Sequence, residues 1–268
     1  MLELEHGFRV VDTHVKLEPD EVRRPRGTGD AEQIEREMQQ AAIVQSLVFP
    51  GDREGSYLKA NNAVARMSVN RPFRAVARIN GARDPGTGAG SRLRNVARRR
   101  SEEHTSPDDI EQYAYEDRFV GFLTDPASDG LPDSEVLAAL EAVDLPVITY
   151  GGRGFEPETI EETLLEYDFP LIIAHCGGYP LDADLMNRAI DLLDRHENCF
   201  VDTSFVQLRD PLERVLMEHP DRVLFGSGAP AVHPDVAVME ILTLDVPEDA
   251  MRKAFSKNAV RVIDELGP

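Results

Sequence analysis

The chain has 268 residues, which is enough for one large hydrophobic core. No run of roughly 18 apolar residues predicts a membrane-spanning helix. Forty-nine acidic and 29 basic residues give a formal net charge of −20, which argues against nucleic acid as a partner because its phosphates would be repelled.

Short apolar runs alternate with helix-like stretches along almost the whole chain. The runs predict strands over residues 8–15, 44–49, 73–79, 119–123, 146–150, 171–175, 199–203 and 223–226. Helices are predicted over residues 31–40, 57–69, 92–100, 133–143, 158–167, 182–195, 211–218 and 235–243, with Asp30 capping the first and two more closing the chain. Because the strands are continuously apolar, both of their faces are expected to be covered, as in a parallel sheet.

Eight strand–helix repeats predict a (β/α)8 TIM barrel, and a doubly wound sheet is the alternative. We expect one domain over residues 1–268, with a polar loop insertion near residues 84–110. This insertion contains a basic helix, whose charges are either solvated and paired within the chain or available for an anionic ligand or another subunit.

Polar residues cluster where the predicted strands end, which is where TIM barrels carry their chemistry. The first strand ends in Asp12, His14 and Lys16, and residues two apart in a strand face the same side. Later strand ends supply Asp125, Tyr150, His175, Asp202 and Ser227, with His233 farther on. These side chains are therefore expected to meet at one mouth of the barrel.

The order and spacing of several motifs resemble the second amidohydrolase family, which includes aminocarboxymuconate-semialdehyde decarboxylase and related metal-dependent decarboxylases and hydrolases. The matching motifs are the opening Asp-x-His of residues 12–14, Val120-Gly121-Phe122, Leu145-Pro146-Val147, Ala174-His175-Cys176-Gly177-Gly178, Val223-Leu224-Phe225-Gly226-Ser227 and Lys257-Asn258-Ala259-Val260-Arg261. The resemblance implies a barrel that hydrolyses or non-oxidatively decarboxylates a small carboxylated or cyclic molecule.

The resemblance also implies one divalent ion, held by two histidines of the first strand, a histidine ending the fifth strand and an aspartate after the eighth. The matching positions here are His14, Lys16, Tyr150 and Gly228, and only the first is an ordinary metal ligand. We therefore expect a degenerate metal site and no cofactor, although the family default is a divalent metal such as zinc. A rebuilt metal site of His175, Asp202 and His233 is the alternative.

Six residues are candidates for the site: Asp12, His14, Lys16, Tyr150, His175 and Asp202. The two histidines could bind a ligand or transfer a proton, and the phenol of Tyr150 could donate a hydrogen bond. The ammonium of Lys16 could replace the charge of the ion, either paired with a carboxylate such as Asp12 or Asp202 or lying close to His14. A purely structural hydrogen bond or ion pair remains the alternative for each of them.

The expected function is that of an amidohydrolase-like hydrolase or decarboxylase acting on a small carboxylated or cyclic molecule. The alternative is a non-catalytic protein of this fold that binds a small anion or a protein partner. Whether it is an enzyme is left open; an active form would be a hydrolase or carbon–carbon lyase that works without a metal. A homo-oligomer is possible.

Localisation and habitat are expected from composition. The N-terminal residues lack the basic start and apolar core of a signal peptide, and Cys176 and Cys199 lie in or beside apolar runs, as buried reduced thiols do. Both observations favour a cytoplasmic protein with no membrane partner. Only four of the 29 basic residues are lysine, and this acid-rich, lysine-poor composition resembles that of halophilic proteins.

Overall fold

The structure is a computed structural model that describes residues 6–18, 29–86, 88–97, 99–115 and 118–267. Residues 1–5, on which the expectation about a signal peptide rests, lie outside the described residues. Positions 87 and 98 of the predicted loop insertion lie outside them as well. No helix in the described ranges is long and apolar enough to cross a membrane.

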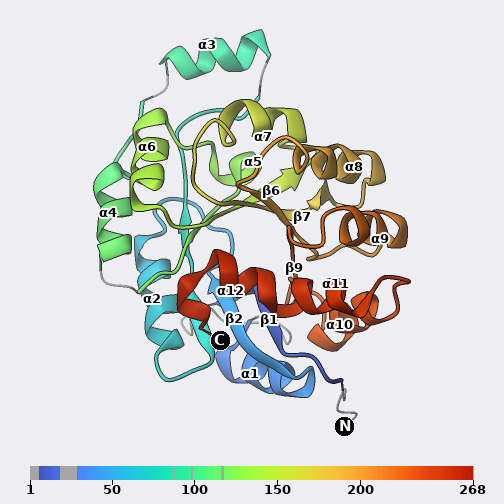
Figure 1. The fold of residues 1–268 in the computed structure, drawn as a ribbon. Helices are drawn as coiled ribbons and strands as arrows, with labels where there is room; N and C mark the ends of the chain where they lie inside the picture. Colours follow the sequence, from blue (N-terminus) through green and yellow to red (C-terminus); the bar gives the residue numbers. More distant parts are fainter. Residues whose placement is uncertain (1–5, 19–28, 87, 98, 116–117, 268) are drawn as a thin grey trace.

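Parallel strands form the wall of a closed barrel (Figure 1). They are β1 (Val10–Lys16), β2 (Ile43–Phe49), β3 (Phe73–Ala75), β4 (Ala77–Ile79), β5 (Phe122–Thr124), β6 (Val147–Gly152), β7 (Leu171–Tyr179), β8 (Cys199–Asp202) and β9 (Val223–Leu224). Only Val76 separates β3 from β4; its amide donates to Val48 of β2, whereas the amide of Ala77 donates to Gly121 before β5. The two segments therefore act as one strand that passes from one neighbour to the next.

The barrel closes between the first strand and the last. The amide of Thr13 donates to the carbonyl of Phe225 and that of Lys16 to Ala229, both at 2.8 Å. Every neighbouring pair of strands around the barrel is parallel. The predicted (β/α)8 barrel is confirmed, and the doubly wound sheet is excluded.

Helices cover the outside of the barrel, as Figure 1 shows. They are α1 (Ala31–Gln40), α2 (Leu58–Ser68), α3 (Ala89–Ala97), α4 (Pro107–Tyr115), α5 (Pro126–Asp129), α6 (Ser134–Val143), α7 (Pro157–Thr163), α8 (Ala183–Leu192), α9 (Arg209–Glu218), α10 (Pro234–Leu242), α11 (Glu248–Arg252) and α12 (Asn258–Val262). A π-helical turn, Lys253–Lys257, joins the last two, and a short 3-10 turn, Asp264–Leu266, follows.

The inside of the barrel is filled with apolar side chains from successive strands. Val11, Leu47, Ile148 and Leu224 belong to this inner cluster and are at most 2% exposed. Ala259 of α12 packs against the same cluster. The barrel is thus a packed core, and its chemistry is confined to the mouth.

Most predicted elements agree with the structure to within a few residues. Asp30 caps α1 by accepting from the amide of Glu32, as predicted. Helix α4 was not predicted, because residues 101–108 read as a polar loop. Helix α3 stands away from the body of the barrel (Figure 1), and its hydrogen bonds run to residues of its own segment, such as Asp84 with Asn95.

Candidate functional site

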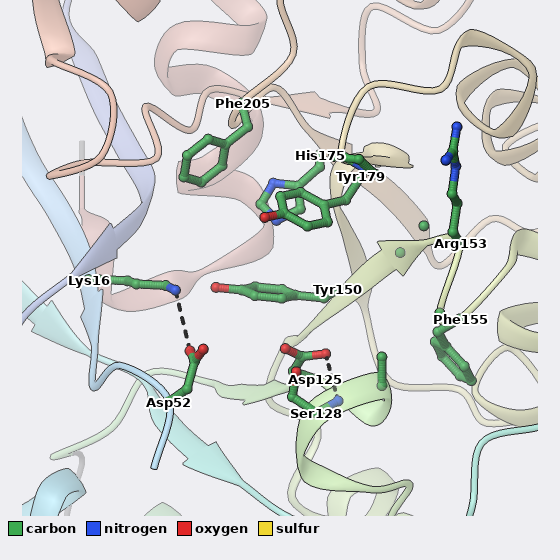
Figure 2. Close-up of a pocket in the computed structure, with 15 residues that line it drawn as sticks. Lys16, Asp52, Asp125, Ser128, Tyr150, Arg153, Phe155, His175, Tyr179 and Phe205 are labelled. Atoms are coloured by element: carbon green, nitrogen blue, oxygen red, sulfur yellow. Dashed lines mark hydrogen bonds and ion pairs between the residues drawn. The ribbon is translucent and has the colours of Figure 1, made fainter.

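A cavity of about 400 Å³ opens at the carboxyl ends of the strands (Figure 2), within the size range of small-molecule sites. Its wall combines strand ends with the loops that follow them, as expected for a TIM barrel. The lining residues are Lys16, Asp52, Asp125, Ala127, Ser128, Tyr150, Gly151, Gly152, Arg153, Gly154, Phe155, His175, Tyr179, Pro180 and Phe205.

A chain of three side chains runs from Tyr150, in the cavity wall, into the buried end of the barrel. Nδ1 of His14 lies 3.0 Å from Oδ2 of Asp202, and both side chains are fully buried. Nε2 of His14 lies 3.3 Å from the hydroxyl oxygen of Tyr150. The carboxylate accepts a hydrogen bond from Nδ1, so Nε2 faces the hydroxyl of Tyr150: it accepts from this hydroxyl when the imidazole is neutral and donates to its oxygen when the imidazole is protonated. Burial raises the pKa of the Tyr150 phenol well above its usual 10.0, so the phenol keeps its proton at neutral pH.

Asp202 also holds the neighbouring strand end in place. Its Oδ1 accepts the backbone amides of His175 and Ser204, both at 2.9 Å, and the hydroxyl of Ser204. Burial alone would raise the pKa of Asp202, but the charge and hydrogen bond of His14 outweigh it and lower the pKa to about 2. The carboxylate is therefore ionised at neutral pH.

His175 lies in a strained segment of β7. Three consecutive residues, His175, Cys176 and Gly177, have positive φ angles of 61°, 47° and 71°. This conformation costs a residue other than glycine about 1–3 kcal/mol and is concentrated at functional sites. Two hydrogen bonds to Asp202 stabilise this backbone conformation: the amide of His175 donates to its Oδ1, and the thiol of Cys176 donates to its carbonyl oxygen.

The imidazole of His175 is neutral and presents one acceptor. Nδ1 lies 3.1 Å from the carbonyl oxygen of Ser204, which can only accept, so Nδ1 carries the proton. Burial lowers the pKa of His175 from 6.5 to about 3, and neighbouring His14 acts in the same direction. At neutral pH, His175 is thus a hydrogen-bond acceptor at Nε2 and a weak base.

Asp12 is a structural anchor in this arrangement. Its Oδ1 accepts the amides of Ser227 and His14, and its Oδ2 accepts the hydroxyl of Ser227 at 2.5 Å. Burial raises its pKa to about 6, against the hydrogen bonds from Ser227. Asp12 is fully buried, and it ties β1 to the segment after β9 without lining the cavity.

Lys16 lines the cavity, but its partner is neither of the predicted carboxylates. Its Nζ lies 3.3 Å from Oδ1 of Asp52, in the loop after β2, and 6.0 Å from the centre of the Tyr150 ring. In Figure 2 the side chains of Lys16 and Tyr150 point toward each other across the cavity. The prediction of a pair with Asp12 or Asp202 is wrong, because those carboxylates are engaged by Ser227 and His14.

Arg78, which sequence reasoning missed, lies fully buried beneath this wall. Its Nε lies 2.8 Å from Oδ2 of Asp129, its Nη1 lies 2.7 Å from Oδ1 of Asp52, and its Nη2 lies 3.7 Å from Oδ2 of Asp125. Tyr57 stacks on the guanidinium and donates its hydroxyl to Asp129. Burial would raise the pKa of Asp52, but the hydrogen bond from Arg78 and nearby positive charges lower it.

Phe205 occupies the space beside Gly228. Gly228 has a φ of +77°, and a Cβ atom at this position would lie 2.8 Å from the Phe205 ring. An aspartate here would be strained and would collide with the ring. Phe205 itself has a φ of 57° and meets the ring of His175 edge-on.

The structure thus brings four predicted residues together, namely His14, Tyr150, His175 and Asp202, and places Lys16 on the wall above them. His233 does not join them, because its side chain caps α10 by accepting from the amide of Asp235. One feature of the sequence could have identified Arg78 as a buried charged residue. Arg78 shares a strand face with Val76, which fills the barrel interior, and a charged residue on that face needs partners.

The model of the amidohydrolase family matches residues 11–264 of the chain. None of the curated proteins compared with the sequence matches it. An uncharacterised TIM-barrel protein from Bordetella bronchiseptica is 18% identical, with a TM-score of 0.68 over 97% of this chain and 100% of that one. A 2,6-dihydroxybenzoate decarboxylase in complex with 2,6-dihydroxybenzoate is 16% identical, with a TM-score of 0.70 over 97% and 100% of the two chains.

A third solved structure corrects the expectation about cofactors. A dihydroxybenzoic acid decarboxylase from Polaromonas sp. JS666, 15% identical with a TM-score of 0.67 over 97% of this chain and 98% of that one, contains bound manganese and the inhibitor 2-nitroresorcinol. The expectation that no cofactor belongs to such a site is therefore wrong, because this family uses a divalent metal.

The side chains present in this region offer few ligands for such an ion. Within the described part of the chain, no group of three His, Cys, Asp or Glu side chains could hold a metal ion. Tyr150 keeps its phenol proton, Lys16 offers no lone pair while protonated, and Gly228 faces the ring of Phe205. His14 and His175 remain as imidazole donors, with ring centres 4.9 Å apart.

Proposed function

The chain belongs to the amidohydrolase family, and we propose that it is a hydrolase or decarboxylase-type enzyme acting on a small carboxylated or cyclic molecule at the barrel mouth. One observation supports this most strongly. The hydroxyl of Tyr150, hydrogen-bonded to His14, lies in a cavity of about 400 Å³ whose wall also carries the ammonium of Lys16.

The cavity suits a flat ring that carries a carboxylate. Tyr150, Phe155, Tyr179 and Phe205 supply aromatic surface, and aromatic walls favour planar apolar ligands. The Lys16 side chain is 33% exposed, so its ammonium is accessible to a ligand carboxylate. The decarboxylases named among the structural neighbours are consistent with such a ligand.

The proton step is assigned to Tyr150. When the ligand is a carboxylated ring, Tyr150 gives its hydroxyl proton to the ring carbon that bears the carboxylate. The bond from that carbon to the carboxylate then breaks, its electron pair returns to the ring, and carbon dioxide leaves. The Tyr150 oxygen then regains a proton from Nε2 of a protonated His14, which takes a replacement proton from solvent, while Asp202 balances the charge on the imidazole.

We further propose that the mononuclear metal site of the family has been largely replaced in this chain. The residues at the matching positions, Lys16, Tyr150 and Gly228, support this reading. A non-catalytic protein that binds a small anion is the second candidate. The low pKa of His175, about 3, favours it, because the imidazole is then only a weak general base at neutral pH.

The test is turnover of a panel of aromatic and cyclic carboxylates, with product detected by chromatography, with and without added manganese. Tyr150→Phe removes only the hydroxyl, so we expect the rate to fall by about 100-fold or more while ligand affinity changes little. Tyr115→Phe is the matched control, because Tyr115 is 87% exposed and does not line the cavity.

Two outcomes would count against the enzymatic proposal. A rate for Tyr150→Phe within about threefold of the unaltered protein would remove Tyr150 from the chemistry, since general acid catalysis contributes far more. Binding of carboxylates with no turnover of any panel member would favour the non-catalytic candidate.

A further inference from the structure

Asp125 lies on the cavity wall with one oxygen atom unused. The residue follows β5 and is 7% exposed. Its Oδ1 lies 3.4 Å from the amide of Ser128, which it caps. Its Oδ2 lies 3.7 Å from Nη2 of Arg78, which is too far for a hydrogen bond.

No hydrogen bond to Oδ2 of Asp125 comes from the part of the chain that the structure describes. The Asp125 side chain is only 10% exposed, and the oxygens of carboxylates that are so largely buried are normally satisfied by a donor. Figure 2 shows this carboxylate directed toward the ring of Tyr150, inside the cavity. The missing donor is therefore best supplied from the cavity.

The charges around this wall do not balance. Two cations, Lys16 and Arg78, face three carboxylates, Asp52, Asp125 and Asp129. Asp52 and Asp129 each have an oxygen within 2.8 Å of Arg78, whereas Asp125 has no such contact. The excess negative charge thus belongs to Asp125, the carboxylate that faces the cavity.

Arg153 does not neutralise it. Although it lines the cavity, its side chain is 71% exposed and pairs with Asp182 at 3.3 Å. In Figure 2 the side chain of Arg153 points away from Tyr150 and Lys16.

We propose that Asp125 binds a protonated amino group of the ligand, so that the cavity selects a zwitterionic, amino-substituted carboxylic acid. The carboxylate half of this ligand rests on the function proposed above, with Lys16 as its partner. The amino half rests on Asp125 alone. A charge-assisted hydrogen bond to Oδ2 then supplies both the missing donor and the missing positive charge.

The two halves can be tested separately with small probes. Benzoate reports on Lys16, benzylammonium reports on Asp125, and 3- and 4-(aminomethyl)benzoate report on both. The matching (hydroxymethyl)benzoates and methylbenzoates carry a neutral donor and no donor, respectively. Dissociation constants would be measured by isothermal titration calorimetry on the full chain at fixed salt.

We expect at least one aminomethyl isomer to bind about tenfold or more tightly than its methyl counterpart, with the hydroxymethyl compound between them. Asp125→Asn keeps the size of the side chain and the cap of Ser128 but removes the charge. It should abolish the aminomethyl advantage and weaken benzylammonium to the same degree, while benzoate binding stays within about twofold of the unaltered protein.

Asp133→Asn is the matched control, because Asp133 also caps a helix, α6, and does not line the cavity. It should leave every affinity unchanged. Benzylammonium binding that is lost in Asp125→Asn supports the inference even if benzoate fails to bind. In that case only the role of Lys16 as the partner of the ligand carboxylate is wrong. Methylbenzoates that bind as well as the aminomethyl compounds, or benzylammonium binding unaffected by Asp125→Asn, would overturn the inference.

Discussion

Replacing Arg78 by methionine should destabilise the protein more than any loss of a surface ion pair. The side chain of Arg78 is 0% exposed, and that of its main partner, Asp129, is 5% exposed. Both Nε and Nη2 lie 2.8 Å from the same Asp129 oxygen, and Tyr57 donates to the other oxygen. Methionine keeps the length of the side chain but leaves a buried carboxylate without a cation.

The size of the effect follows from burial. Removing one partner of a buried ion pair costs about 3–5 kcal/mol, mainly because the remaining charge is unpaired. Asp52 adds little to this, because its side chain is 60% exposed and water can screen it. For a chain of this length, about 2 °C of melting temperature is lost per kcal/mol, so Tm should fall by about 6–10 °C.

The assay is urea unfolding followed by circular dichroism, with Arg214→Met as the control. Arg214 pairs with Asp191 at 2.7 Å and Glu218 at 2.9 Å, but its side chain is 31% exposed. Its loss should cost about 1 kcal/mol or less. Adding Asp129→Asn to Arg78→Met should recover part of the stability, because the unpaired charge is then gone. A loss of stability for Arg78→Met no larger than that for Arg214→Met would show that the buried pair with Asp129 contributes no more than a surface ion pair.

Three further predictions concern pH, salt and the contact between Gly228 and Phe205. Folding lowers the pKa of His175 from 6.5 to about 3. Below pH 6.5 the unfolded chain therefore binds a proton at His175 that the folded chain does not bind, so the free energy of unfolding falls from pH 6.5 toward pH 3. The pKa of Asp12 is raised to about 6, so Asp12 has the opposite effect on stability between about pH 4 and 6. The test is therefore the difference in unfolding free energy between the unaltered protein and His175→Asn, because the contribution of Asp12 cancels in that difference. That difference should approach about 1.4 kcal/mol per pH unit in chemical unfolding, and parallel pH profiles would contradict it. The net charge of −20 should make Tm rise between about 0.1 M and about 1 M sodium chloride, as the Debye length falls from ~10 Å to ~3 Å, and a Tm independent of salt would count against a salt-adapted surface. Gly228→Ala should cost about 1–3 kcal/mol from its positive φ and the Phe205 ring, and less in a Phe205→Ala background; equal costs in both backgrounds would show that the ring is not the obstacle.

The barrel could be predicted because its strands leave a local signal. Runs such as Leu171–Ala174 are apolar at every position, and the helices between them begin at caps such as Asp30 and Asp133. The meeting of His14, His175 and Asp202 then follows from topology, because parallel strands end at the same mouth.

The contacts inside the site could not be predicted in the same way. Asp12 and Asp202 were both reasonable partners for Lys16, but the choice depends on which donors reach each carboxylate first. Ser227 and His14 reach them, and neither contact has a local signal in the sequence. Asp52 lies in a loop, and its position beside Lys16 depends on the buried guanidinium of Arg78.

The proposed function requires the cavity at the barrel mouth to bind a small carboxylated molecule through Lys16. The most direct test is the dissociation constant of benzoate, measured by calorimetry at fixed salt for the unaltered protein, Lys16→Met and Lys257→Met. Lys257 pairs with Asp249 on the surface and does not line the cavity, so its loss should leave the affinity unchanged. We predict binding about tenfold weaker for Lys16→Met alone. Equal affinity in all three proteins, or no detectable binding of benzoate or any related ring carboxylate, would rule out this role for Lys16.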